Sequence, residues 1–170
     1  VSPDGRRKYA PASCLTVLAL AACLWFNVRW QEYGLFSAIV LDVGQGESVA
    51  RRSGGETVLV DCGSSNSYVD AGSVAADTLQ SAGVRRLSAV VVTHYHADHT
   101  NGLTEVLTRL PVDMLYLPDI EDEYGVRGRL VSLAERRGIA VVFVTVPTRI
   151  TLGEAALTFY PPLQTTGDLN

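Results

Sequence analysis

All three histidines of the 170-residue chain lie within six residues, in the stretch AVVVTHYHADHTNG. They are His94, His96 and His99, and Asp98 lies among them. In a partly extended loop His94 and His96 point the same way and can share one ion, while Asp98 and His99 can turn toward a second. Imidazole with carboxylate suits Zn²⁺, Fe or Mn²⁺. The stretch contains no cysteine, so a four-coordinate structural zinc site is not expected. We therefore expect a metal centre here rather than a polar surface loop that happens to contain histidines.

The elements around this stretch would place it at the edge of a sheet. RLSAVVVTH has three consecutive valines, as in a strand buried on both faces. NGLTEVLTRL has helical spacing, and Thr100 or Asn101 could cap that helix. Loops at the carboxyl ends of strands are where α/β proteins place their sites, so the sequence predicts a strand, a ligand turn and then a helix.

The rest of the chain alternates strands and helices. We expect strands over 35–43, 112–117 and 139–146, the last of them buried. We also expect helices over 68–83 and 123–138, and hairpins that turn at residues 53–55 and at 153–154. A hairpin region followed by alternating helices and strands predicts an α+β fold in which helices cover a sheet.

Composition and charge limit the classes of function. The chain is 47% hydrophobic and 19% charged, which suits one modest domain with a real core. Three widely spaced cysteines suggest no disulfide framework. Residues 1–30 carry a net charge of +3, which leaves −7 on residues 31–170 of a chain whose total is −4. No basic stripe indicates nucleic-acid binding, so metal ions and local arginines would have to hold any polyanion.

Residues 1–30 resemble a membrane segment with a basic flank. The stretch SCLTVLALAACLWF is uncharged, Trp25 and Trp30 lie at one end of the apolar run, and Arg6, Arg7 and Lys8 lie at the other. The length just suffices to span a bilayer, and the charge bias places residues 31–170 on the extracellular side of the cell membrane. Alternatives are a signal peptide, a lipoprotein site at LAAC, and a buried helix of a soluble protein.

The histidine stretch resembles the His-x-His-x-Asp-His signature of the metallo-β-lactamase fold, residue by residue at His94, His96, Asp98 and His99. The resemblance implies an αββα fold and two divalent metal ions, Zn or Mn. It also implies that the aspartate at the end of ETVLVDCGSS, Asp61, orients the site from behind the ligands. Thr93 occupies the family's position for a small hydroxyl residue.

From about residue 38 onward the chain is similar to the extracellular domain of ComEC-type competence DNA-uptake proteins. LDVGQGES, VLVDCGS and the stretch that ends in THYHADHTNGL carry this resemblance. It implies a nuclease that cuts the DNA strand not taken up, with single-stranded DNA, the membrane and other competence proteins as partners. Gly44, Gln45 and Gly46 could line the substrate mouth or form only a tight turn.

The family's later ligands are not found after His99, since the chain has no further histidine and Asp168 is interpreted as a turn residue. We therefore expect residues 31–170 to be the amino-terminal half of the domain, cut from a longer protein, and inactive alone.

In the complete site Asp98 would act catalytically, holding the second ion and orienting a hydroxide. The alternatives are a membrane-anchored hydrolase of another ester, such as a lactone, and a DNA-uptake module that does not cut.

Overall fold

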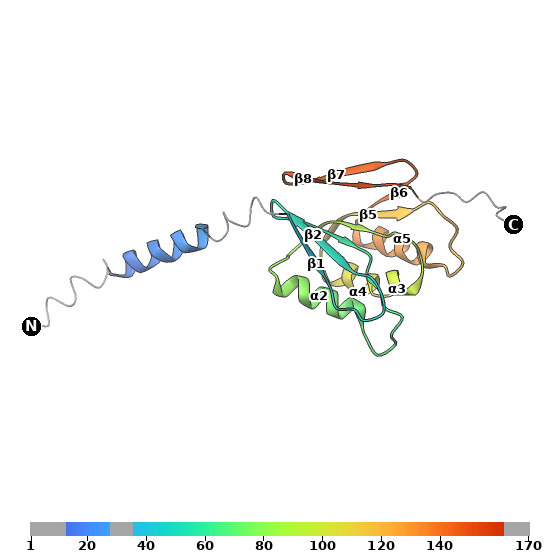
Figure 1. Ribbon diagram of the computed structural model, residues 1–170, viewed down its shortest axis with the longest axis horizontal. Helices are drawn as coiled ribbons and strands as arrows, with labels where there is room; N and C mark the ends of the chain where they lie inside the picture. The colour runs from blue at the N-terminus through green and yellow to red at the C-terminus, as the bar shows by residue number, and fades with distance from the viewer. Residues whose placement is uncertain (1–12, 28–35, 162–170) are drawn as a thin grey trace, which may run out of the picture.

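The computed structural model describes residues 13–27 and 36–161, and most of the second range forms a sheet with helices on one side (Figure 1). The strands are β1 (Ser37–Val40), β2 (Val49–Ser53), β3 (Glu56–Val60), β4 (Leu87–Val91), β5 (Val112–Pro118), β6 (Ala140–Val144), β7 (Thr148–Leu152) and β8 (Ala155–Phe159). The helices are α2 (Ala71–Ser81), α3 (Ala97–Thr100), α4 (Leu103–Arg109) and α5 (Val126–Arg137).

The main sheet has the strand order β1-β2-β3-β4-β5-β6, and β7 and β8 form a separate hairpin. β1, β2 and β3 are antiparallel, and the predicted tight turn between β2 and β3 is confirmed, with positive φ at both Gly54 and Gly55. β3, β4, β5 and β6 run parallel, with α2, α4 and α5 in the crossovers. Their carboxyl ends therefore meet at one edge of the sheet, and the histidine stretch leaves β4 at that edge.

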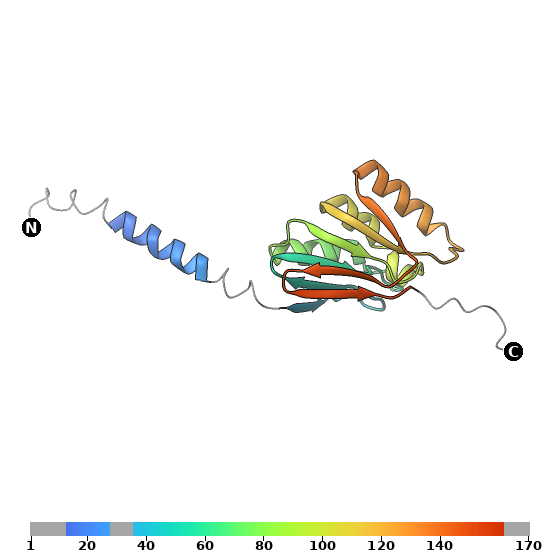
Figure 2. The same ribbon diagram turned by 90° about the horizontal axis from the view of Figure 1, so that it is seen from above.

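Both faces of the central strands are buried, each against a different layer. Leu59, Val90 and Leu115 pack with the helices, whereas their strand neighbours Val58 and Val91 pack toward hairpin β7-β8. Figure 2 shows the hairpin alongside the sheet on the side away from α5. The described residues thus form a helix layer, a six-stranded sheet and a two-stranded layer, which agrees with the α+β class and the expected order of layers.

Three local predictions need correction. The strand predicted over 139–146 as buried is the edge strand β6, where Ala140 is exposed. The strand predicted over 35–43 is shorter, since β1 covers only 37–40 and residue 35 lies outside the described residues. The helix predicted to start at 101 begins earlier and is broken in two, α3 and α4.

Neither Thr100 nor Asn101 is the N-cap of a helix in this region, and Asn101 is instead the C-cap of α3. His96 is the N-cap of α3 and Gly102 that of α4, and neither makes a side-chain capping bond. The Asn101 amide instead accepts from the Ser64 N–H and donates to the Ser64 carbonyl. These two hydrogen bonds link the ligand turn to the loop after β3. Asn101 therefore makes a tertiary contact where its local propensity predicts an N-cap.

Residues 13–27 form a helix. Across 13–27 and 36–161, no helix is long and apolar enough to cross a membrane. The membrane helix predicted over residues 1–30 is therefore unsupported by the described part of the chain. Residues 1–12 and 28–30 of that prediction, and Asp168, lie outside the described residues.

Candidate metal centre

The ligand turn begins where β4 ends and passes directly into α3. His96 has extended backbone angles, with φ −66° and ψ 153°, and the helix starts at the next residue. Thr100 donates its hydroxyl to the His96 carbonyl at 2.9 Å, which holds this short helix against the turn. Because the chain changes from extended to helical inside the signature, four ligand side chains can converge from only six residues.

The structure brings together all four metal ligands that the sequence predicts. His94, His96 and Asp98 each offer a ligand atom, and these atoms lie within 4.8 Å of one another. The ring of His99 lies 3.8 Å from that of His94, between centroids, and its Nε2 is 3.7 Å from a carboxylate oxygen of Asp98. Asp98 therefore lies close both to the His94–His96 pair and to His99. The assignment of each ligand to one of two ions stays a prediction.

Asp61 lies behind these ligands and is fully buried at the end of β3. Its carboxylate accepts from the Thr93 N–H at 2.8 Å, from the Thr93 hydroxyl at 2.6 Å and from Nδ1 of His99 at 2.8 Å. With its proton on Nδ1, His99 presents Nε2 as a lone pair toward Asp98. This geometry agrees with the orienting role that the sequence implies for Asp61 and Thr93.

The backbone of Asp61 is in the left-handed region, with φ 54°. It is the one non-glycine residue with positive φ in the described chain, and aspartate and asparagine tolerate this conformation better than other side chains do. Its N–H still continues the parallel ladder by donating to the Val91 carbonyl at 2.9 Å. The unusual φ therefore turns the chain sharply at the place where the carboxylate must face Thr93 and His99.

Glu47 belongs to the site and was missed from the sequence. One of its carboxylate oxygens lies 3.9 Å from Nδ1 of His99, and Glu47, Asp61 and His99 form a second group of ligand atoms within 4.8 Å. Its side chain is 51% exposed, unlike that of Asp61. The available signal was an acid placed directly after the glycine turn GQG, a turn for which the sequence predicts either a substrate mouth or only a tight turn.

The glycine turn itself packs against the ligand turn. A Cβ on Gly46 would lie 2.7 Å from the Asp98 carbonyl oxygen and closer still to that of Gly63. The Glu47 N–H donates to the Asp98 carbonyl at 3.0 Å, and the Gln45 carbonyl accepts from the Ser65 N–H at 2.6 Å. The loop that contains Gly44, Gln45 and Gly46 therefore supports the site, and its role as a substrate mouth stays a prediction.

The electrostatics favour neutral imidazole at the first ligand. Burial lowers the pKa of His94 below its usual value, and the neighbouring His99 adds to this effect. A histidine must be neutral to bind a metal ion. The donor set of imidazoles and carboxylates fits a divalent transition metal such as Zn²⁺ or Mn²⁺.

The sequence of the chain matches the model of a known protein family. A model described as the Metallo-beta-lactamase superfamily matches residues 41–165. The chain belongs to the metallo-beta-lactamase superfamily. No curated protein matches the chain significantly.

The chain is also similar to several solved structures. MEM-A1, a subclass B3 metallo-beta-lactamase from a soil metagenome library, is 17% identical with a TM-score of 0.52, over 74% of this chain and 50% of that one. YhfI from Bacillus subtilis, a metallo-beta-lactamase fold protein, is 21% identical with a TM-score of 0.45, over 70% and 45%. A diphosphatase of the PhnP family is 21% identical with a TM-score of 0.37, over 67% and 47%.

At these identities the likeness to MEM-A1 shows a shared fold and nothing about the substrate. The chain spans about half the length of each of these three solved structures.

Proposed function

We propose that this metallo-beta-lactamase domain is part of a metal-dependent hydrolase that cuts phosphodiester bonds. The observation that carries the proposal is the gathering of His94, His96 and Asp98 within 4.8 Å, beside a His99 that Asp61 holds through Nδ1. Three imidazoles and one exposed carboxylate at the carboxyl edge of a parallel sheet form an open ligand set, as a hydrolytic centre requires.

The proposed roles of the two aspartates differ with their burial. Bound divalent ions would lower the pKa of a water molecule and neutralise charge on a phosphodiester. Asp98 is 41% exposed and lies close to the His94–His96 pair and to His99, so it could hold a metal ion and orient an attacking water. Asp61 is sealed from solvent and keeps His99 in one orientation and one tautomer. Thr93 donates twice to Asp61 and fixes that carboxylate in turn.

We further propose single-stranded DNA as the substrate, in a ComEC-type uptake protein at the cell membrane, with residues 31–170 outside. The support is the sequence resemblance from about residue 38 onward, together with the apolar run and basic flank of residues 1–30. Other competence proteins would then be its partners. This placement rests on sequence alone, and a membrane fractionation of cells that express the intact protein would test it.

The activity is tested with the longest form of the protein that carries this chain. Labelled single-stranded DNA is incubated with Mn²⁺ or Zn²⁺, beside a double variant His94→Ala/Asp98→Ala. We expect cleavage that a chelator abolishes and that the variant lacks. Equal, chelator-insensitive cleavage by both proteins would refute the proposal. Hydrolysis of a lactone without DNA cleavage, or DNA binding without cleavage, would each refute it in favour of one of the alternatives above.

A further inference from the structure

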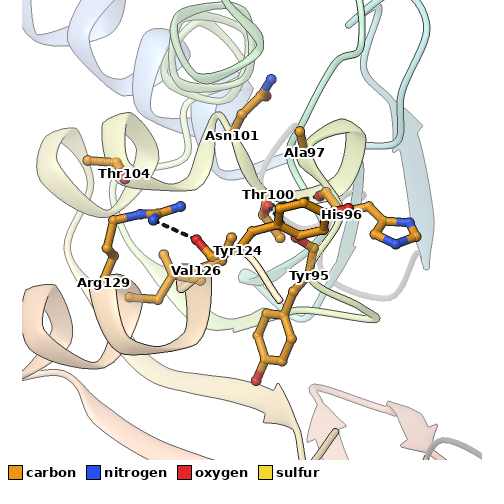
Figure 3. Close-up of a pocket in the computed structure, with 10 residues that line it drawn as sticks. Tyr95, His96, Ala97, Thr100, Asn101, Thr104, Tyr124, Val126 and Arg129 are labelled. Carbon is orange, nitrogen blue, oxygen red and sulfur yellow. Dashed lines mark hydrogen bonds between the residues drawn. The ribbon is translucent and has the colours of Figure 1, made fainter. Parts of the chain in front are cut away.

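A groove runs from the metal centre along the helix layer. A cavity of about 650 Å³ is lined by His96, Tyr124, Thr104 and Arg129, among others (Figure 3). A second hollow of about 590 Å³ shares Thr104 and Arg129 with it and extends to Arg136. We call the two together the α4–α5 groove. It begins at a predicted metal ligand, so a substrate held at the metal could continue into it.

Two arginines of α5 line this groove without an acidic partner. Arg129 donates to the carbonyl of Tyr124 at 2.9 Å. Among the described residues, neither Arg129 nor Arg136 lies within 4.0 Å of a carboxylate, whereas Arg127 pairs with Asp119. Two positive charges in one hollow of a domain with a negative net charge favour an anion there.

The loop between β5 and α5 carries four acids, and two of them bond to groups other than Arg129 and Arg136. Asp119 is paired with Arg127 at 3.1 Å. The Asp122 carboxylate accepts the N–H groups of Tyr124 and Arg127, at 3.1 and 2.7 Å, and so is occupied at the start of α5. Two of the loop's acids therefore have partners of their own.

Tyr124 gives the groove a flat aromatic surface. Its side chain is 61% exposed, and its ring lies 6.3 Å from that of His96, between centroids. Figure 3 shows Tyr124 between Arg129 on one side and His96 on the other. An exposed aromatic ring beside cationic side chains is how proteins bind unpaired bases without sequence preference. The wall beyond it is open, since a Cβ on Gly128 would meet nothing within 4 Å.

We propose that the α4–α5 groove is a subsite for single-stranded nucleic acid, adjacent to the phosphate held at the metal centre. Tyr124 stacks on an unpaired base, and Arg129 and Arg136 contact successive backbone phosphates. This inference rests on the proposed phosphodiesterase function and names where its polymeric substrate lies. A duplex is excluded from this mode, because stacking on Tyr124 needs a base that is free of its partner.

Binding, rather than cleavage, is the direct test. Fluorescence anisotropy of a labelled oligothymidylate is measured on the purified chain without added metal, from 50 to 200 mM salt. The variant Arg129→Gln/Arg136→Gln is compared with Arg85→Gln/Arg149→Gln, which removes the same charge from exposed positions outside the groove. Each phosphate contact on a single strand contributes about 0.7 to the logarithmic salt slope. If Arg129→Gln/Arg136→Gln loses two contacts, the fold-loss of affinity between 50 and 200 mM salt should be about sevenfold smaller than in the wild type. The control variant should keep the wild-type slope.

A second pair of variants tests the stacking surface. We expect Tyr124→Ala to bind about fivefold more weakly or worse, from a stacking contribution of at least ~1 kcal/mol per base. Tyr68→Ala removes a ring that is 97% exposed and lies outside the groove, and it should bind like the wild type. Circular dichroism and zinc affinity should be unchanged in all four variants, since none of these side chains is buried or a predicted ligand.

The outcomes separate this inference from the proposed function. If the groove variants and their controls lose the same amount of oligonucleotide affinity, or if the wild type does not bind, the groove is not a nucleic-acid subsite. DNA cleavage at the wild-type rate by the groove variants would also refute the subsite, while leaving the proposed hydrolase function unaffected. Groove-dependent binding with no cleavage of DNA or of bis(p-nitrophenyl) phosphate by the longest form would support the groove and refute the hydrolase.

Discussion

The buried carboxylate of Asp61 offers the sharpest perturbation of the metal centre. Asp61→Asn keeps the shape of the side chain and tolerates the φ of 54° at this position. It removes the negative charge that accepts three hydrogen bonds, two from Thr93 and one from His99. The amide has one acceptor oxygen, so at least one of these donors loses its partner.

The magnitude follows from these contacts. A hydrogen bond to a charged group contributes about 1.5–3 kcal/mol. If the amide oxygen keeps only the Thr93 N–H, two such bonds are lost, and the free energy of unfolding falls by about 3–6 kcal/mol. An amide Nδ2 beside His99 would also favour the tautomer with its proton on Nε2, the atom that faces Asp98. Because a protonated nitrogen cannot bind metal, we expect a 10- to 100-fold loss of zinc affinity.

Two measurements on the purified chain test this reasoning. Urea unfolding of the metal-free protein reports stability, and competition with a zinc-binding dye reports affinity. Thr93→Val is the comparison variant: it deletes the hydroxyl that donates to Asp61 and lies 3.0 Å from Nδ1 of His94, but it keeps the backbone donor and the Asp61 charge. Its loss of stability should therefore be smaller than that of Asp61→Asn. A D61N protein within 1 kcal/mol of wild type, with unchanged zinc affinity, would refute the orienting role.

Three further predictions concern the surroundings of the site. Burial raises the pKa of the Cys62 thiol from 9.0 to about 12. As the pH rises, the unfolded chain therefore loses this proton before the folded chain does. The free energy of unfolding should fall by up to about 1.4 kcal/mol per pH unit above pH 9. Urea titrations at pH 8, 9 and 10 should show this loss in wild type and not in Cys62→Ala. Gly63→Ala should destabilise the chain by several kcal/mol, because its Cβ would lie 2.5 Å from the carbonyl carbon of Asp98. Gly128→Ala, in open space within α5, should stabilise it by about 0.5–1 kcal/mol. Thermal unfolding of the two variants beside the wild type checks both expectations. Glu47→Gln should weaken zinc binding several-fold in the dye assay without lowering the melting temperature, and an equal loss of stability would contradict its assignment to the site.

Much of the site was predictable because its signals are local. His94, His96, Asp98 and His99 are close in sequence, and a strand followed by a short helix is enough to gather them. The turn of hairpin β2-β3 was equally predictable, because two adjacent glycines supply the positive φ that a tight turn needs. Asp61 was expected only through the family resemblance, since nothing local relates it to a turn 32 residues further along the chain.

Other features depended on how distant backbones approach each other. Asn101 suits a helix cap by type, yet its amide pairs with Ser64 because the loop after β3 lies against the ligand turn. The run at 139–146 is apolar enough for a central strand, but β6 is at the edge because no described strand pairs beyond it. Composition and periodicity describe one segment at a time and do not contain the order of strands in a sheet.

By itself, the sequence determined the ligand types, their spacing, and the alternation of strands and helices, because each depends on side-chain chemistry and short-range backbone preference. Only the tertiary structure decided that Glu47 belongs to the site. Its carboxylate comes within 3.9 Å of His99 because Gly46 and Gly63 lack side chains and let three separate segments interlock by backbone hydrogen bonds. The tertiary structure also brings His96, Tyr124 and Arg129 around one cavity, although His96 and Arg129 are 33 residues apart and no local pattern relates them.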